Sequence, residues 1–189
     1  LVRAAGGATA VTSWVRKQGV ADQRIDRDTA GILREFFGLP EGAFNDALQE
    51  ALKRDPNLLE KGDRPDPAFD DDVRDTSTPA AMVQLLTRIF SGKALSPDST
   101  QVLMSIMERC RTGDARLKGR LPPGIVVANK TGTIGGSVND VGVIALPEDR
   151  GKIVIAVFIK KSAAPMEERE RAIAEIARAV YDYYLFAER

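Results

Sequence analysis

The sequence predicts an α+β fold, in which a mostly helical part precedes an antiparallel sheet and a covering C-terminal helix. Up to position 121, apolar residues recur at helical spacing between residues that start or stop helices. After Pro122, Pro123 and Gly124 the pattern becomes extended, with three β-branched runs. The helical period returns at Met166 and continues nearly to the end of the chain.

Start signals mark the helices of the first part. Residues 9–18 form a short helix closed by Gly19, and Thr78 followed by proline starts another that ends near Gly92. Ser96 followed by proline repeats this signal for a helix that runs to Cys110. Helical spacing predicts that the following residues face inward: Met82, Leu85, Leu86, Ile89, Val102, Leu103, Ile106 and Met107.

The second part contains three short strands, at residues 125–128, 141–146 and 153–159. Their short connections favour antiparallel pairing. Residues 166–186 form an amphipathic helix, and its predicted sheet-facing stripe consists of Ile173, Ile176, Ala177, Val180, Tyr184 and Leu185. Tyr181, Tyr183 and Tyr184 are interpreted as helix packing, and Trp14 as core packing.

We expect residues 1–189 to be a single domain fragment, because a chain of 189 residues with 43% hydrophobic content can bury one core of ordinary size. Its helical part spans 1–121 and its sheet part 122–189. Residues 28–74 are of mixed character, with an apolar cluster, a stretch of helical spacing, and a loop rich in Gly, Pro and Asp at 61–72.

Composition excludes several kinds of site and partner. Lys+Arg and Asp+Glu are balanced at 27 each, which argues against a nucleic-acid partner. No apolar run is long enough to span a bilayer, and the first residues carry no signal-peptide pattern. Cys110 is the only cysteine, so no internal disulfide is expected. Histidine is absent, which excludes a Ser-His-Asp triad and the usual zinc motifs, and no metal or other cofactor is expected.

The sharpest local motif is Lys130-Thr131-Gly132-Thr133, which follows an extended run. Lys130 supplies positive charge, and the Thr131 hydroxyl can bind an anionic substrate group. Gly132 removes bulk, so that a substrate can lie against the strand edge. The Thr133 N–H can serve as an oxyanion donor. By itself this three-letter motif is more typical of a solvated strand end than of a binding site.

Five segments in order give this motif its context: residues 24–27, 74–82, 116–122, 137–141 and 166–169. Together they resemble the C-terminal portion of class A serine β-lactamases, within the penicillin-recognising serine hydrolases, whose signatures are SxxK, SDN and KTG. Residues 1–7 resemble the end of the helix that follows the SDN loop of that family. The resemblance implies a β-lactamase/transpeptidase-like fold, catalytic roles for Lys130, Thr131 and Thr133, and substrate binding by Gly132, Ser137 and Asn139. Asn139 and Asp140 are equally typical of a turn or strand start.

Two of the three signatures are missing from residues 1–189, since no serine has a lysine three residues later and no SDN occurs. The resemblance places both upstream of Leu1. We therefore expect that an N-terminal segment with the nucleophile and the first strands is absent, that the fold is incomplete, and that this chain alone is inactive.

The resemblance also calls for a water-activating glutamate where this chain has Thr29. A threonine cannot act as a general base near neutral pH. Two alternatives are open: Glu35 or Glu41 has taken over, or deacylation is slow, as in a penicillin-binding protein.

Arg27 and Asp75 match the ion pair that closes the Ω loop of this family, with Asp26 and Arg74 as a second possible pair. These groups are structural clamps. The sequence between them, the insertion at about 28–74, is either a surface helix packed on the domain or a reshaped wall of the site.

The expected function is β-lactam hydrolysis by an acyl-serine enzyme without a metal or organic cofactor. The alternatives are a peptidoglycan transpeptidase or carboxypeptidase with slow deacylation, and an inactive binding module. The expected partners are a small β-lactam or a peptidoglycan stem peptide, and the protein's own N-terminal segment. The resemblance implies a periplasmic or secreted protein.

Overall fold

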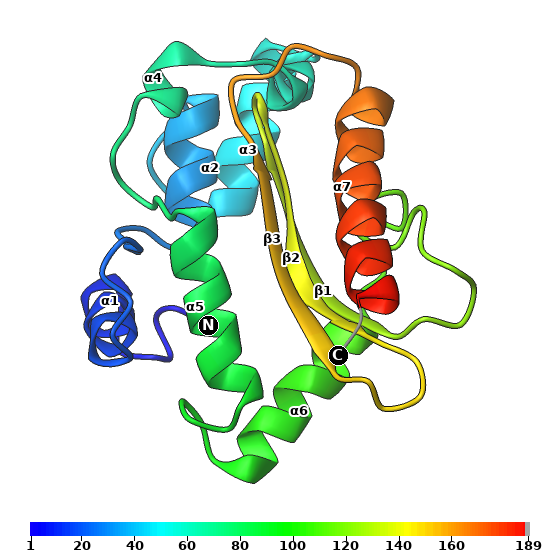
Figure 1. Ribbon diagram of the computed structural model, residues 1–189. Helices are drawn as coiled ribbons and strands as arrows, with labels where there is room; N and C mark the ends of the chain where they lie inside the picture. Colours follow the sequence, from blue (N-terminus) through cyan, green and yellow to red (C-terminus); the bar gives the residue numbers. More distant parts are fainter. Residues whose placement is uncertain (188–189) are drawn as a thin grey trace.

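The computed structural model describes residues 1–187 and confirms the α+β class. Within that range the sheet has three strands, β1 (Val127–Ile134), β2 (Ser137–Ala145) and β3 (Lys152–Ile159), in the order β1-β2-β3. Helix α7 (Met166–Phe186) covers one face, while α5 (Pro79–Phe90) and α6 (Pro97–Glu108) pack on the other (Figure 1). No helix among the described residues has the length and apolarity to cross a membrane.

Both strand pairs are antiparallel, as their short connections predicted. Strand β1 extends further than expected, so the Lys130–Thr133 motif lies inside it. In the β1–β2 register Lys130 lies opposite Val141, and Gly132 lies opposite Asn139. The register therefore places Asn139 on the same face of the sheet as Gly132.

Side chains that alternate along the strands build two apolar layers. The layer under α7 is made of Leu117, Val127, Val138, Ile144, Ile153, Ile155, Val157, Ile173, Ala177 and Tyr181. The layer under α5 and α6 is made of Leu86, Met107, Ala128 and Val141, with Phe158 and others partly buried beside them. A slip of β1 by one residue would move Val127 out of the layer under α7 and Ala128 out of the layer under α5 and α6.

The predicted helix starts are confirmed by their caps. Thr78 Oγ1 accepts from Ala81 N at 3.1 Å, and Ser96 Oγ accepts from Ser99 N at 3.3 Å. Helix α1 (Ala8–Lys17) matches the first predicted helix and contributes Val15 and Trp14 to a core with α5. Residues 2–6 are turns, and Ala5 N donates to Leu1 O at 3.0 Å and Gly7 N to Val2 O at 2.9 Å, as at the end of a helix.

The predicted inner faces of two helices were partly wrong. Val102 and Ile106 are exposed on α6, and Ile176, Tyr183 and Tyr184 are exposed on α7. Each helix contacts the sheet through a narrower stripe than the sequence pattern suggested. Tyr181 confirms the packing prediction, since it is 2% exposed.

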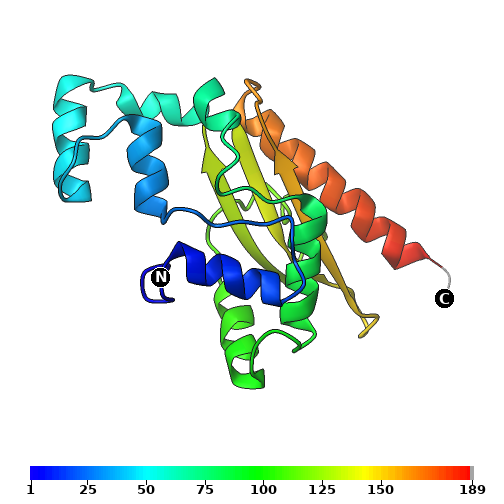
Figure 2. The ribbon, with the colours of Figure 1, turned by 90° about the vertical axis from the view of Figure 1, so that its left-hand side faces the viewer.

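The segment between the clamp residues folds as an inserted lobe, which we define as residues 28–74. It contains α2 (Thr29–Phe37), α3 (Phe44–Arg54), the 3₁₀ helix η1 (Leu58–Asp63) and α4 (Pro67–Asp70). The lobe has a small core of its own, made of Phe37, Leu39, Phe44, Ala47, Leu48, Ala51, Leu52 and Leu58. Figure 2 shows α2 and α3 projecting to one side of the sheet.

The inserted lobe touches the β1–β2 turn, just beyond the Lys130–Thr133 motif. A Cβ on Gly135 would lie 3.1 Å from Cε2 of Phe36, and one on Gly136 would lie 3.0 Å from Cγ of Pro65. Arg169 on α7 donates to the carbonyls of Gly135 and of Asp63, and so joins the turn, the lobe and the helix. The lobe thus restrains the end of the strand that carries the motif.

Candidate active site

The KTG motif occupies a strand edge that β2 does not cover. Val126 O accepts from Ala145 N, and in an antiparallel pair such bonds recur at every second residue. Thr131 and Thr133 therefore direct their backbone groups away from β2. Lys130 Nζ donates to Thr131 O at 2.7 Å, at this edge. The Thr133 N–H is consequently available to a ligand.

The motif's hydroxyls lie against groups from the loop before β1. Thr131 Oγ1 is 2.7 Å from Thr112 Oγ1. Arg116 Nη2 donates to Thr133 Oγ1 at 2.7 Å, and its Nη1 donates to the carbonyls of Gly132 at 3.3 Å and Asn139 at 3.0 Å. The Arg116 guanidinium therefore holds the Thr133 hydroxyl and the carbonyls of Gly132 and Asn139 together at the end of the motif.

Arg116 is 5% exposed, and its Nε donates to Glu170 Oε1 on α7 at 3.1 Å. This ion pair compensates the buried charge and fixes the plane of the guanidinium. The sequence interpretation missed Arg116 and Thr112 as site residues. The only signal was the spacing of residues 116–122 from the motif, because neither residue belongs to a local pattern that indicates binding.

The predicted substrate-binding residues lie on the face of the sheet opposite to the side chains of Thr131 and Thr133. Asn139 is the neighbour of Gly132, since a Cβ on Gly132 would be 3.9 Å from both Cβ and Nδ2 of Asn139. Ser137 lies opposite Ile134, one pair further along that face. The structure therefore brings Gly132 and Asn139 together, with Ser137 at the periphery.

Asp140 supports the site from within the sheet. Its side chain is fully buried and accepts from Asn129 Nδ2 at 3.0 Å and from Leu117 N at 3.2 Å. Burial raises the pKa of Asp140, although these hydrogen bonds oppose the shift. Asp140 thus ties β2, β1 and the loop that carries Arg116 into one unit.

The neck of the inserted lobe, defined as Arg27, Glu35, Asp72, Arg74 and Asp75, is a network of ion pairs. Arg27 Nε lies 2.7 Å from Asp75 Oδ2, and Asp75 Oδ1 accepts from Arg27 N and Asp26 N at 2.9 and 2.6 Å. Arg27 also pairs with Glu35 at 2.5 Å and Asp72 at 3.2 Å. The predicted Arg27–Asp75 pair is present in the structure.

The second pair, Asp26 with Arg74, was wrong. Asp26 pairs with Arg24 at 2.6 Å and accepts from Asp75 N at 2.8 Å, while Arg74 pairs with Glu35 and Asp72. The backbone of Asp75 is left-handed, with φ of 52°.

The neck also shows whether Glu35 can replace the glutamate that the family resemblance calls for at position 29. Thr29 is the first residue of α2 and is exposed. Glu35 Oε2 lies 2.6 Å from Arg74 Nη2, and this hydrogen bond, with the one from Arg27, lowers the pKa of Glu35 against the effect of partial desolvation. A carboxylate held in this way is a weak base, so the neck argues against Glu35 as a general base. Within residues 1–187, no cluster of His, Cys, Asp or Glu side chains could hold a metal ion.

Comparison with known proteins identifies the family that has this architecture. The model of the Beta-lactamase enzyme family matches residues 1–184. The chain belongs to the β-lactamase enzyme family. Among curated relatives in this family, β-lactamase VEB-1 of Pseudomonas aeruginosa is 41% identical over 117 residues, which are 58% of this chain and 39% of VEB-1. A β-lactamase of Bacteroides uniformis is 34% identical over 169 residues, or 83% of this chain and 55% of that protein.

Solved class A β-lactamases share the fold. An ancestral class A enzyme matches with a TM-score of 0.71 and 33% identity, over 96% of this chain and 57% of that chain. TLA-1 extended-spectrum β-lactamase matches with a TM-score of 0.71 and 30% identity, over 97% and 56%. The class A resemblance drawn from the sequence is confirmed. The chain spans about half the length of the β-lactamases it matches.

Proposed function

We propose that the complete protein hydrolyses β-lactams through an acyl-serine intermediate, with the serine supplied by a segment outside residues 1–189. The observation that carries this is the open strand edge at Thr131–Thr133 with Arg116 beside it. Membership of the β-lactamase family supports the reaction, and the greater length of the relatives supports a further segment.

In this mechanism the substrate carboxylate binds to the Thr131 and Thr133 hydroxyls beside Arg116. The serine oxygen then bonds to the lactam carbonyl carbon, and the Thr133 N–H stabilises the resulting oxyanion. The C–N bond of the ring breaks, and its nitrogen takes up one proton in exchange for the one that the serine hydroxyl loses. Lys130 adds positive charge near the reacting atoms. Water finally cleaves the ester and releases the serine.

A peptidoglycan transpeptidase or carboxypeptidase is the second candidate, and the neck favours it. Thr29 stands in place of the expected glutamate, and Glu35 is engaged by two arginines. Without a base for water, the acyl-enzyme would persist, as in a penicillin-binding protein.

Nitrocefin separates these candidates when it is added to a version of the protein that includes the nucleophile segment. Multiple turnovers support hydrolysis, and a single stoichiometric burst supports the penicillin-binding alternative. An inactive binding module gives neither. Residues 1–189 alone are expected to remain unlabelled by a fluorescent penicillin, and labelling would contradict the external serine.

An antibiotic-resistance role and a periplasmic or secreted location belong to the same proposal. They rest on the family alone. Fractionation of cells that express the complete gene, combined with the minimal inhibitory concentration of a penicillin, tests both. A protein confined to the cytoplasm would contradict the proposed location.

A further inference from the structure

A buried carboxyl and a buried amide, those of Asp140 and Asn129, lie side by side next to the KTG motif. Asp140 lies opposite Thr131 in the β1–β2 register, and Asn129 lies opposite Gly142. Because Gly142 has no side chain, the Asn129 amide can extend diagonally, and its Nδ2 lies 3.0 and 3.1 Å from the two oxygens of Asp140. Both side chains are 0% exposed.

No cation contacts the Asp140 carboxyl among the described residues. Its donors are the Asn129 amide and the Leu117 N–H, which lies 3.2 Å away. Arg116 attracts a charge on Asp140, but its guanidinium donates to Glu170, to Thr133 Oγ1 and to two backbone carbonyls instead. A fully buried carboxylate without a contacting cation is costly.

The surroundings of Asp140 are mostly apolar. Val157 lies opposite it on β3, and Ile173 of α7 belongs to the same layer. The charged and titratable groups around it are Arg116 and Cys110 from the loop before β1, and Glu170 of α7, which pairs with Arg116. Burial raises the pKa of Asp140 and outweighs the hydrogen bonds and the arginine, which lower it.

Asn129 adds an independent observation, because its Oδ1 is buried and has no hydrogen-bond partner. A buried acceptor without a donor destabilises the fold. A proton on Asp140 would satisfy this oxygen. After rotation of the Asn129 amide about its Cβ–Cγ bond, the acid donates its O–H to Asn129 Oδ1, and its other oxygen accepts from Asn129 Nδ2 and Leu117 N.

We propose that Asp140 is held as a neutral carboxylic acid and, paired with Asn129, is a positioning residue for the KTG edge of β1. It holds the Leu117 N–H, and thereby the loop from which Arg116 reaches Thr133. Its proton also keeps negative charge away from Thr131, where an ionised Asp140 would repel a substrate carboxylate. The statement about substrate rests on the proposed function, whereas the statement about the proton does not.

The proton is observed directly by NMR of residues 1–189 with ¹³C at the Cγ atoms of aspartate. Exposed aspartates are ionised at about pH 6. The Asp140 signal, assigned by its absence from Asp140→Asn, should have the chemical shift of a carboxylic acid at that pH. The shift of a carboxylate would overturn the proposal.

Asp140→Asn should stabilise the fold, because an amide reproduces the hydrogen bonds of the neutral acid and cannot ionise. A raised folded pKa gives stability that is present below the unfolded value of about 3.9 and is lost as the pH rises through the folded value. The advantage of the variant in the unfolding constant should thus grow by up to about 10-fold per pH unit above about pH 4, until the folded pKa is reached. Urea denaturation measures it, and a variant less stable than wild type at about pH 6 would contradict a neutral Asp140.

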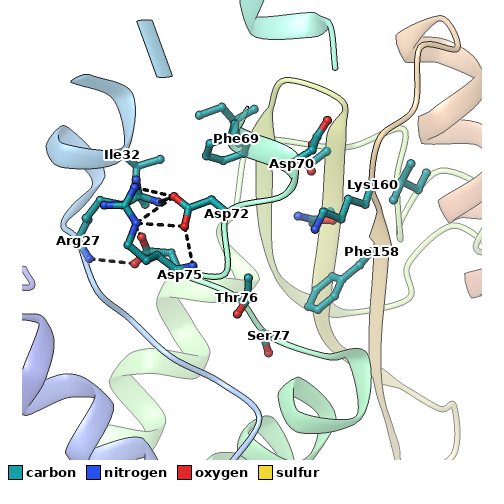
Figure 3. Close-up of a pocket in the computed structure, with 15 residues that line it drawn as sticks. Arg27, Ile32, Phe69, Asp70, Asp72, Asp75, Thr76, Ser77, Phe158 and Lys160 are labelled. Carbon is teal, nitrogen blue, oxygen red and sulfur yellow. Dashed lines mark hydrogen bonds and ion pairs between the residues drawn. The ribbon is translucent and has the colours of Figure 1, made fainter. Parts of the chain in front are cut away.

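Asp75 is the matched contrast, because Figure 3 shows its carboxylate beside Arg27, whose Nε lies 2.7 Å from Asp75 Oδ2. Asp75→Asn should raise the unfolding constant about 10-fold or more, since it weakens hydrogen bonds between charged groups. Cys110→Ser is the second control, because Cys110 also titrates and interacts electrostatically with Asp140. It should leave the effect of Asp140→Asn unchanged. An equal stabilisation by Asp75→Asn, or loss of the effect in Cys110→Ser, would overturn the proposal.

Benzylpenicillin binding, followed by ligand-observed NMR against pH, separates positioning from a purely structural role. The wild-type affinity should stay constant while Asp140 keeps its proton and fall about 10-fold as the ¹³C signal reports its loss. Asp140→Asn should keep the low-pH affinity throughout. A wild-type affinity that ignores the ionisation of Asp140 would overturn the positioning role and leave the proposed function intact. Absence of binding in every variant at every pH would contradict the proposed function, and the ¹³C signal would still decide the protonation of Asp140.

Discussion

Arg116 donates to the Thr133 hydroxyl at 2.7 Å while the same guanidinium pairs with Glu170 on α7. This relationship connects β1 to α7, the helix that covers the same face of the sheet. It also explains how a nearly buried arginine is accommodated beside β1, because the carboxylate of Glu170 compensates its charge.

Arg116→Lys should therefore weaken binding of benzylpenicillin to residues 1–189 by about 10-fold, the equivalent of about 1.4 kcal/mol. A lysine keeps the charge but cannot engage Thr133, Asn139 and Glu170 in one plane. Ligand-observed NMR measures the affinity. Arg120→Lys is the control, since Arg120 is exposed and pairs only with Glu175 on the surface; an equal loss there would contradict the assigned role.

Loss of the Thr131 hydroxyl should weaken benzylpenicillin binding more than loss of the Thr112 hydroxyl, which orients Thr131. Thr131→Val removes a direct contact to the carboxylate, worth about 1.5–3 kcal/mol for a charged hydrogen bond. Thr112→Val leaves that contact and removes only the partner at 2.7 Å. The dissociation constants of the two variants for benzylpenicillin give the comparison. A larger effect from Thr112 would reverse the roles assigned here.

Arg27→Met should destabilise the chain by about 3 kcal/mol, the lower end for a broken buried ion pair. The Arg27 side chain is 11% exposed, and the change removes the cationic partner of Asp75, whose side chain is 14% exposed. Urea denaturation gives the free energy of unfolding. Arg54→Met, which breaks an exposed pair with Glu50 on α3, should cost less than about 0.5 kcal/mol. If both variants lose a similar free energy of unfolding, the ion pairs of the neck do not stabilise the fold more than an exposed pair does.

Acid should loosen the inserted lobe. The hydrogen bonds from Arg74 lower the pKa values of Asp72 and Glu35 below the unfolded values of about 3.9 and 4.3. A lowered folded pKa gives stability that is present above the unfolded value and is lost as the pH falls through the folded value. Hydrogen exchange in α2 should thus accelerate below about pH 4.

Arg74→Met should flatten that pH dependence, because it removes the main cause of both pKa shifts. Exchange in α6, which is remote from the neck, provides the internal control. A wild-type lobe that exchanges at the same intrinsic-corrected rate at pH 3 and pH 6 would contradict the role of these pairs.

Two glycines of the sheet should respond in opposite ways to alanine. A Cβ on Gly142 would lie 2.2 Å from Ala128 O, so Gly142→Ala should destabilise the fold by about 1–3 kcal/mol or more. Gly132 has only Asn139 atoms at 3.9 Å, so Gly132→Ala should retain stability and weaken ligand binding. Thermal denaturation and benzylpenicillin affinity check the two variants, and an unstable Gly132→Ala would disprove the contrast.

Sequence reasoning predicted the elements that local chemistry specifies. Thr78 and Ser96 cap their helices because a side-chain oxygen followed by proline determines a helix start locally. The antiparallel strands followed from short connections, and the clamp between Arg27 and Asp75 followed from resemblance. The roles of Lys130, Thr131, Gly132, Thr133, Ser137 and Asn139 stay predictions.

The tertiary structure decided which distant residues meet. Nothing in the local sequence links Arg116 to Thr133, because that contact depends on how the loop before β1 packs against the sheet. The exposed Val102 and Tyr184 show the same limit, since periodicity identifies an apolar stripe but not the element that covers it. Local hydrogen bonding and periodicity thus set the elements of this protein, and long-range packing set its site.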